Sequence, residues 1–299
     1  MKKKFMSIAL ASVMALSLAG CGGSAGGTTT AADTTVAAPA DTTAEASSED
    51  TTAADNTSAE AAEATESAGG TLIVGFDQDF PPMGFIGDDG EFTGFDLELA
   101  QEVAKRLGLE YKPQPIAWDA KDMELEAGNI DCIWNGFTMT GREDDYAWTD
   151  AYMANTQVFV VAKDSGIASQ ADLAGKVVEC QVDSSAEAAL KEVPDLTATF
   201  KDLLTTADYN TAFMDLEQGA VDAIAMDVIV AGYQIQQRNA DFVILDDSLS
   251  AEEYGVGFKK DNTELRDKVQ KTLEEMAADG TLKSISEKWF GEDVTTIGK

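Results

Sequence analysis

The stretch FDLELAQEVAKRLG, residues 95–108, predicts an amphipathic helix that ends at Gly108. Phe95, Leu99, Val103 and Leu107 recur every fourth residue, which places them on one face of a helix. The apolar run TLIVGF, residues 71–76, reads as a strand before this helix, and residues 109–116 read as a strand after it. The Asp-Gly turn inside residues 84–95 predicts a hairpin that leads into the helix.

The same alternation of strands and helices continues along the chain. Strands are expected at 130–134, 156–164, 177–181, 221–227 and 242–245. Helices are expected at 119–127, 206–218, 262–278 and 281–290. One more helix is expected to start near 183, and another is expected to follow the strand 221–227 and to end near 238. Ser184 and Glu187 have the spacing of a capping box at the start of the helix near 183. Alternating strands and helices predict parallel α/β sheets, and two such blocks, 71–155 and 176–246, predict two lobes.

The first 69 residues have a different composition. Residues 1–21 carry three lysines, an apolar stretch and small residues, which is typical of a secretory signal. Their end, LAGC, resembles a bacterial lipobox, so Cys21 is expected to carry a lipid anchor; the alternative is an ordinary cleaved signal with a chance cysteine. Residues 22–69 hold nine acids, no base and no aromatic residue, which predicts a disordered acidic linker.

Composition excludes several functions. The chain has 54 acidic and 21 basic residues, so nucleic acid is not an expected partner. Without any histidine there is no Ser-His-Asp unit, no histidine base and no histidine-ligated metal, and we expect neither a metal nor a cofactor. Cys132 and Cys180 lie in apolar runs and are expected to be buried thiols, although a disulfide between them is the alternative.

Arg142 stands out among the four arginines, because the other three lie in or beside predicted helices. It lies in the polar loop NGFTMTGRED, residues 135–144, after an apolar strand. Asp77, the Asp183–Ser185 turn and Asp227 also follow predicted strands. Open α/β sheets bind ligands at the carboxyl ends of their strands, so these residues are candidates for one site.

These motifs resemble the extracellular solute-binding proteins, family 3, of ATP-driven polar amino acid importers. The resemblance rests on GFDQDFPPMGF, GEFTGFDLELAQEVAKRLG, LEAGNIDCIWNGFTMT, LEQGAVDAIAMD and the closing helices, LRDKVQKTLEEMAADGTLKSISEKWFG, in that order. It implies a two-lobed, type II periplasmic-binding-protein fold with two crossing strands. Lobe 1 would comprise 70–159 plus 255–299, and lobe 2 would comprise 160–254.

The chemistry of a free amino acid fits this resemblance. Its carboxylate needs donors and its ammonium needs acceptors, because an unpaired buried charge is costly. Arg142 offers a planar two-pronged donor for a carboxylate. Hydroxyl and N–H groups of Thr138, Thr140, Ser184 and Ser185 add donors, while the backbone carbonyl of Asn135 is a candidate acceptor.

The resemblance assigns the remaining site residues. It implies Asp227 as the ammonium acceptor, Gly136 as a point of close backbone approach, and a side-chain pocket formed by Asp77, Phe80, Trp118 and Gln181. Two departures from the family pattern concern this site. Only one residue separates Thr140 from Arg142, where relatives usually have two, and Asp183 stands where relatives often have glycine.

The sequence therefore predicts a lipid-anchored extracytoplasmic receptor, not an enzyme, that delivers an amino acid to the permease of an ABC importer. The expected ligand is polar and neutral, such as glutamine, with a basic amino acid as the alternative; the protein is expected to be a monomer. An enzyme that dehydrates a cyclic carboxylic acid, with Asp77 or Glu143 as acid or base, is the competing function. A sensor module of a receptor is the third candidate function.

Overall fold

The computed structural model describes residues 69–299. The predicted signal with Cys21 and the predicted linker, apart from its last residue, lie outside the described residues. Within the described part, no helix combines the length and the apolar character needed to cross a membrane.

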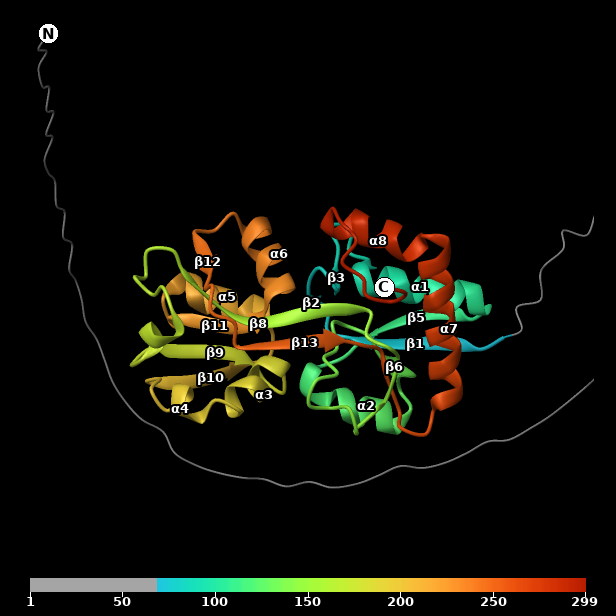
Figure 1. Ribbon diagram of the computed structural model, residues 1–299, viewed down its shortest axis with the longest axis horizontal. Coiled ribbons are helices and arrows are strands. Elements are labelled where there is room, and N and C mark those ends of the chain that lie inside the picture. Colours follow the sequence, from blue (N-terminus) through green and yellow to red (C-terminus); the bar gives the residue numbers. More distant parts are fainter. Residues whose placement is uncertain (1–68) are drawn as a thin grey trace, which may run out of the picture. The chain divides into compact units, whose positions relative to one another are not determined.

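The first lobe is built on a five-stranded sheet in the order β5-β1-β6-β14-β7 (Figure 1). β1 pairs parallel with β5 and β6, whereas β14 pairs antiparallel with β6 and β7. The bounds are β1 Thr71–Phe76, β5 Glu110–Pro115, β6 Cys132–Ile133, β7 Ala147–Trp148 and β14 Gly257–Phe258. The predicted hairpin forms a separate small sheet of β2 Asp79–Phe80, β3 Gly84–Ile86 and β4 Phe92–Thr93.

Helices cover both faces of this sheet, with α1 and α8 on one side and α2 on the other (Figure 1). The helices are α1 Phe95–Leu107, η1 Trp118–Ala120, α2 Lys121–Ala127, α7 Thr263–Asp279 and α8 Thr281–Phe290. The apolar face predicted for α1 is buried at Phe95, Leu99 and Val103. Gly108 ends the helix in the left-handed conformation, with φ of 68°, as the sequence predicted.

The second lobe is built on a sheet in the order β10-β9-β11-β8-β12, in which β13 also pairs with β8. Its strands are β8 Met153–Ala162, β9 Val177–Gln181, β10 Asp202–Thr206, β11 Ala223–Asp227, β12 Phe242–Ile244 and β13 Ser250–Tyr254. Its helices are η2 Gln170–Leu173, α3 Ser185–Lys191, α4 Pro194–Thr197, α5 Tyr209–Gln218 and α6 Val228–Arg238.

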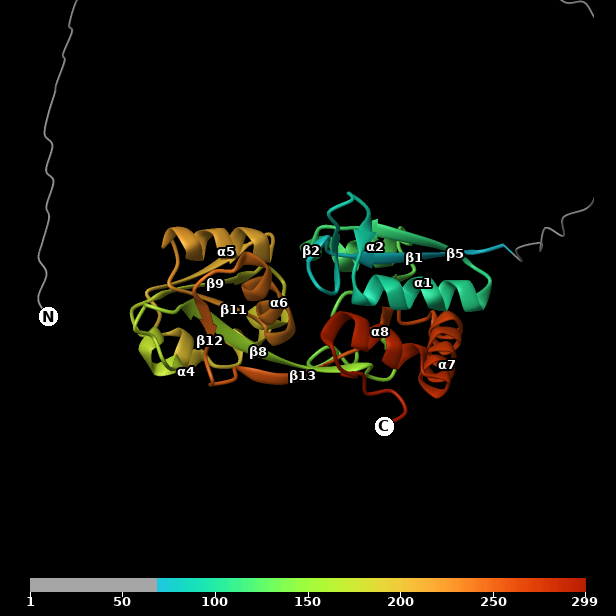
Figure 2. The ribbon, with the colours of Figure 1, turned by 90° about the horizontal axis from the view of Figure 1, so that it is seen from above.

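β8 and β13 pair antiparallel and run between the two lobes (Figures 1 and 2). The first half of β8 pairs with β13, and its second half pairs with β11 on one side and β12 on the other. The sheets are therefore mixed and not wholly parallel as the alternation suggested, because the chain returns through strands that oppose the others.

Three local predictions need correction. β10 was missed, because it is an exposed strand at the sheet edge without an alternating pattern. β8 begins at Met153, three residues before the predicted start at 156, because polar residues interrupt the apolar pattern there. The capping box at α3 is only half formed: Ser184 Oγ accepts from the Glu187 N–H, but the Glu187 carboxylate accepts from Asp183 N–H.

Cys132 and Cys180 are free and buried, which excludes the alternative disulfide.

Asp96 on α1 is a fully buried acid that links the helix to the loop after β6. Its Oδ2 accepts hydrogen bonds from Gly136 N–H at 2.5 Å and from the Tyr152 hydroxyl at 2.8 Å. Burial raises the pKa of Asp96 to about 7, although these two hydrogen bonds oppose the rise. The native fold therefore holds this proton more tightly than the unfolded chain does.

We expect the free energy of unfolding to fall as the pH rises through this interval. A raised native pKa contributes stability at low pH that is lost as pH rises toward the native value, by about 1.4 kcal/mol per unit. Between about pH 5 and pH 7, Asp96 should therefore account for a loss of about 2 kcal/mol, because the slope falls to half as the pH reaches the native pKa. Asp96→Asn should remove this part, as measured by urea unfolding at the two pH values. The exposed Asp88→Asn is the control, and equal pH dependence in both variants would contradict the role of Asp96.

Candidate functional site

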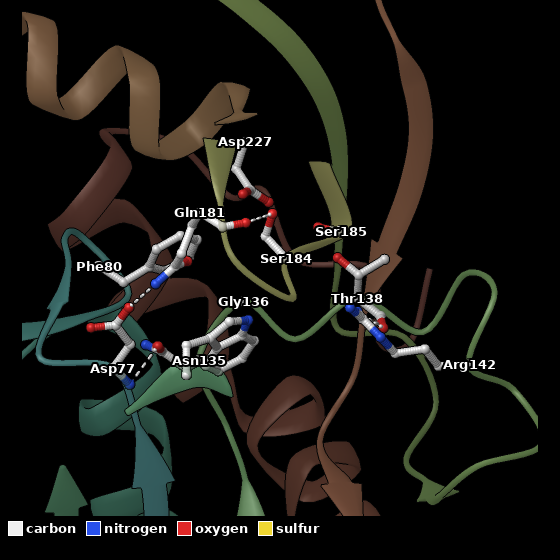
Figure 3. A pocket seen from close by; sticks show the side chains of 11 residues that line it. Asp77, Phe80, Asn135, Gly136, Thr138, Arg142, Gln181, Ser184, Ser185 and Asp227 are labelled. Atoms are coloured by element: carbon white, nitrogen blue, oxygen red, sulfur yellow. Dashed lines mark hydrogen bonds between the residues drawn. The ribbon is translucent and has the colours of Figure 1, made fainter. Parts of the chain in front are cut away.

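A pocket lies at the carboxyl ends of β1, β6, β9 and β11, between the two lobes (Figure 3). The empty space between its lining atoms, together with the part open to solvent, is about 280 Å³. Eleven of the twelve residues predicted for ligand binding line it: Asp77, Phe80, Trp118, Asn135, Gly136, Thr138, Arg142, Gln181, Ser184, Ser185 and Asp227. The structure thus brings loops of both lobes to one site.

Asp77 lies at one end of the pocket, directly after β1. Its Oδ1 accepts from Asp79 N–H at 2.8 Å, and its Oδ2 accepts from Gln181 Nε2 of the other lobe at 2.6 Å. Asn135 holds the Asp77 backbone, since its Oδ1 accepts from Asp77 N–H at 2.9 Å. Burial raises the pKa of Asp77 to about 6, which the two hydrogen bonds to its carboxylate partly offset. This end of the pocket is an acceptor for a cation or an N–H donor.

Arg142 lies at the opposite end from Asp77, as Figure 3 shows. Its Nη1 donates to the Thr138 carbonyl at 3.2 Å, and its Nη2 donates to the Asp183 carbonyl of the other lobe at 3.4 Å. The guanidinium carbon lies 5.4 Å from the centre of the Phe137 ring. These contacts orient the guanidinium and use two of its five N–H donors, which leaves donors for an anion.

Asp227 ends β11 and lines the pocket from the second lobe. It is 2 % exposed, and its Oδ1 accepts from Asn155 Nδ2 at 2.7 Å and from the Tyr254 hydroxyl at 2.5 Å. Burial, followed by the charge of nearby Glu252, raises its pKa well above the usual range. No lysine or arginine of the described residues hydrogen bonds to this carboxylate, so it is an uncompensated acceptor.

Ser184 and Ser185 bring the start of α3 to the pocket. Ser184 is the N-cap, because its Oγ accepts from Glu187 N–H at 3.1 Å while donating to the Gln181 carbonyl at 2.7 Å. Ser185 Oγ accepts from Gln157 Nε2 at 3.0 Å, so its own hydroxyl hydrogen remains available as a donor.

Aromatic rings form the apolar walls of the pocket. Phe80 stacks at a tilt on Tyr209 of the other lobe, with ring centres 5.9 Å apart. Trp118 makes an edge contact with Phe137 at 5.6 Å. Both lining rings are nearly buried, which shields the charged groups from water and strengthens their electrostatic interactions.

Several polar atoms buried at the pocket have no hydrogen-bond partner among the described residues. They include Asn135 Nδ2 and Thr138 Oγ1 in the lining. An unpaired buried polar group costs about 1–3 kcal/mol, so a bound polar molecule that reached them would remove this penalty.

Thr140 is the one predicted site residue that does not line the pocket. It is exposed in the turn before Arg142 and is not among the lining residues. The sequence analysis also missed residues that surround Asp227, namely Asn155, Gln157, Glu252 and Tyr254. The signal that was available is the polar pair Asn155 and Gln157, two residues apart in a strand that is otherwise apolar from 158 to 162.

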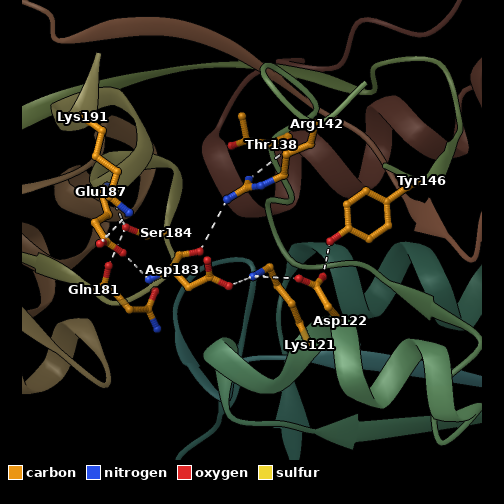
Figure 4. A network of polar contacts seen from close by, with 10 residues as sticks. All are labelled: Lys121, Asp122, Thr138, Arg142, Tyr146, Gln181, Asp183, Ser184, Glu187 and Lys191. Carbon is orange, nitrogen blue, oxygen red and sulfur yellow. Dashed lines mark hydrogen bonds and ion pairs between the residues drawn. The ribbon is translucent and has the colours of Figure 1, made fainter. Parts of the chain in front are cut away.

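An ion pair links the lobes beside the pocket (Figure 4). The Lys121 ammonium on α2 pairs with the Asp183 carboxylate before α3 and lies 5.4 Å above the Trp118 ring. Lys121 has a side chain only 2 % exposed, whereas that of Asp183 is 51 % exposed. Asp183 has a φ of 57°, a conformation that costs energy for a residue other than glycine. The contact explains why an acid is useful at this turn.

The described residues contain no cluster of ligands that could hold a metal ion. The chemistry of the pocket is instead that of charge pairing: a guanidinium at one end, two carboxylates, hydroxyl groups and aromatic walls. This arrangement is suited to binding a small dipolar molecule.

Residues 72–292 match the family model of the bacterial extracellular solute-binding proteins, family 3. The L-cystine-binding protein TcyJ of Escherichia coli strain K12 is 35% identical over 229 residues, covering 76% of this chain and 85% of that protein. The lysine/arginine/ornithine-binding periplasmic protein of the same strain is 30% identical over 233 residues, covering 75% and 89%.

Solved structures show the same similarity. A substrate-binding protein of an ABC uptake transporter from Streptococcus pneumoniae, with bound histidine, has a TM-score of 0.74 and 36% identity, covering 76% of this chain and 94% of that one. An ancestral arginine-binding protein bound to glutamine has a TM-score of 0.69 and 39% identity, covering 75% and 99%.

The Lys121–Asp183 pair should respond asymmetrically to substitution. Asp183→Asn keeps a residue that tolerates positive φ but leaves the buried ammonium with only the more distant Asp122 carboxylate, 4.0 Å away, so we expect a loss of about 1–3 kcal/mol in the free energy of unfolding. Lys121→Met leaves a half-exposed carboxylate that water can solvate, and should cost less than about 1 kcal/mol. Urea unfolding of both variants and the double variant measures this. Equal losses of unfolding free energy in the two single variants would contradict this arrangement of the pair.

Proposed function

The chain belongs to the bacterial extracellular solute-binding proteins, family 3, and from this premise we propose that its interlobe pocket binds one free amino acid for delivery to an ABC importer. The family and the relatives named above are binding proteins, so the chain is a binding protein and not an enzyme. The dehydratase alternative has no support from them.

The observation that carries the proposed site is the placement of Arg142 and Asp227 on one pocket. They come from different lobes and have opposite charges, and each retains capacity for a further partner. An α-amino acid carries a carboxylate and an ammonium on the same carbon, so it can bridge them. In this proposal Thr138 and Ser185 add donors to the carboxylate, and Thr140 has no contact with the ligand.

The ligand's side chain is proposed to point toward Asp77. A further hollow adjoins this end and includes four acids in its lining: Asp77, Asp79, Asp119 and Asp208. These carboxylates favour a side chain that donates hydrogen bonds or carries positive charge, and they disfavour an acidic one. We therefore propose a polar neutral ligand such as glutamine, with a basic amino acid as the alternative. Relatives that bind arginine and histidine, and one bound to glutamine, are consistent with this range.

The remaining parts of the proposal concern the location of the receptor. The family is extracytoplasmic, and the sequence LAGC at residues 18–21 supports lipid attachment at Cys21. The linker, residues 22–69, would then tether a monomeric receptor to the membrane. The lobe boundaries proposed are 70–159 plus 255–299 for lobe 1 and 160–254 for lobe 2, with the crossing strands β8 and β13 as the hinge.

Arg142→Ala should abolish amino acid binding without unfolding the protein. Removing one partner of a buried, hydrogen-bonded charge pair costs about 2–5 kcal/mol, so we expect a loss of at least about 30-fold in affinity. Isothermal titration calorimetry measures the binding, and circular dichroism measures the fold.

Arg238→Ala is the matched control for Arg142→Ala. Arg238 is also partly exposed and lies over a phenyl ring, with its guanidinium carbon 5.0 Å from the centre of Phe213, but it does not line the pocket. The Arg238→Ala variant should bind the amino acid with the affinity of the wild type. Unchanged affinity of Arg142→Ala would remove the proposed carboxylate site.

A thermal-shift screen tests the proposed ligand class. L-Glutamine or L-arginine should raise the melting temperature, whereas L-glutamate should not, because its second carboxylate would meet Asp77 and the neighbouring acids. Asp77→Asn should weaken L-arginine binding by about tenfold or more, since it removes a charge-assisted hydrogen bond. A stronger shift with L-glutamate than with the other two would contradict the proposed orientation.

A further inference from the structure

Glu252 is a buried acid next to Asp227, and no pattern in the sequence indicated its role. It lies on the crossing strand β13, and only 6 % of its surface is exposed. Its Oε1 accepts from Asn155 Nδ2 at 2.6 Å and from Gln157 Nε2 at 2.7 Å. The neighbouring Glu253 is exposed on the other face of the strand, as the two-residue period of a strand requires.

Strand register brings Glu252 to Asp227. On β8, Asn155 is the partner of Glu252 on β13, and Gln157 is the partner of Asp227 on β11. The single Nδ2 group of Asn155 donates to both acids, at 2.7 Å to Asp227 and 2.6 Å to Glu252. Two carboxyl groups that share one amide nitrogen must lie within a few ångströms of each other.

Among the described residues, no lysine or arginine hydrogen bonds to either acid. Their hydrogen-bond donors are two amides and the Tyr254 hydroxyl, all neutral. Tyr209 from α5 lies near Asp227, and Tyr152, which precedes β8, packs against Tyr254. Within the pocket lining, the charged groups are Asp77 and Arg142, and both acids are nearly inaccessible to water. Two adjacent buried carboxylates repel, so one of such a pair retains its proton at neutral pH.

We propose that Asp227 and Glu252 form a carboxyl pair that shares one proton and releases it to solvent when the ligand's ammonium group binds. The inference rests on the proposed function, in which Asp227 receives the ammonium. The proton leaves the pair as the ammonium supplies the positive charge in its place, so two carboxylates then face one cation. Glu252 acts through Asn155 and Asp227 and is a positioning residue, not a direct ligand contact.

The pair has a consequence for the hinge. Asp227 belongs to the second lobe, whereas Glu252, Asn155 and Gln157 belong to the two strands that cross between the lobes. Gln157 Nε2 also donates to Ser185 Oγ in the pocket lining, which links Glu252 to both the ammonium side and the hydroxyl side of the site. The proton of the pair is therefore held by residues on the strands about which the lobes would move.

Infrared spectroscopy tests the shared proton without any ligand. In the wild type at about pH 7, a carboxylic-acid C=O band should be present that the double variant Asp227→Asn/Glu252→Gln lacks and that the control Glu253→Gln retains. Asp96 and the other acids with raised pKa values contribute equally to all three proteins, so the difference spectra isolate the pair. Identical bands in the double variant and the wild type would overturn the shared proton.

Calorimetry in two buffers of different ionisation enthalpy tests the release. With L-glutamine or L-arginine, neither of which titrates its side chain near neutrality, the wild type should release up to about one proton, and its affinity should rise by up to about tenfold per pH unit. Glu252→Gln should release fewer protons and show a flatter pH profile, whereas Glu253→Gln should match the wild type. Asp77 is unchanged in all three proteins, so a proton that it releases does not contribute to the differences between them.

The outcomes separate this inference from the function on which it rests. Binding without proton release, or with equal release from Glu252→Gln and Glu253→Gln, would overturn the carboxyl pair and leave the amino acid receptor intact. Failure of the wild type to bind any of the twenty amino acids would overturn the proposed function, and with it the release step, even if the infrared band were present. If Glu252→Gln failed to fold, zero proton release by the wild type would still refute the inference.

Discussion

The arrangement of the pocket depends on the pairing of β8. This ten-residue strand is the antiparallel partner of β13 over its first half and of β11 and β12 over its second half. A shift of one residue in any of these registers would turn Asn155 and Gln157 to the opposite face of the sheet. The amides that hold Asp227 and Glu252 would then be lost. Backbone pairing therefore fixes two buried acids, on β11 and β13, against the amides of β8.

Charge burial is the second constraint on the site. Asp77, Asp96 and Asp227 are all shielded from water, and burial is the largest cause of the raised pKa of each. Neutral amides, hydroxyls and backbone N–H groups hold these acids, so their desolvation is only partly compensated. In the proposed function, the ammonium group of the ligand supplies positive charge to Asp227, whereas Asp96 lies outside the pocket lining.

The position of each lobe's loops explains which site residues the sequence could predict. Asp77, Arg142 and Asp227 follow strands whose apolar runs are clear, so the edge at which they gather follows from parallel pairing. Thr140 lies outside the pocket lining, and the signal in the sequence was its spacing from Arg142, one residue shorter than relatives usually have. Asp183 stood out in the sequence as an acid where relatives often have glycine, but its contact with Lys121 did not, since the contact joins two lobes through positions 62 residues apart.

By itself, the sequence determined the succession of strands and helices, the bounds of α1 and the short loops that carry the pocket residues. These follow from local periodicity and from stop signals such as Gly108, which act within a few residues. Only the tertiary structure decided that Glu252 faces Asp227, that Lys121 reaches Asp183 and that the sheets are mixed. Such contacts depend on strand register and on the meeting of two lobes, and neither leaves a periodic trace in the chain.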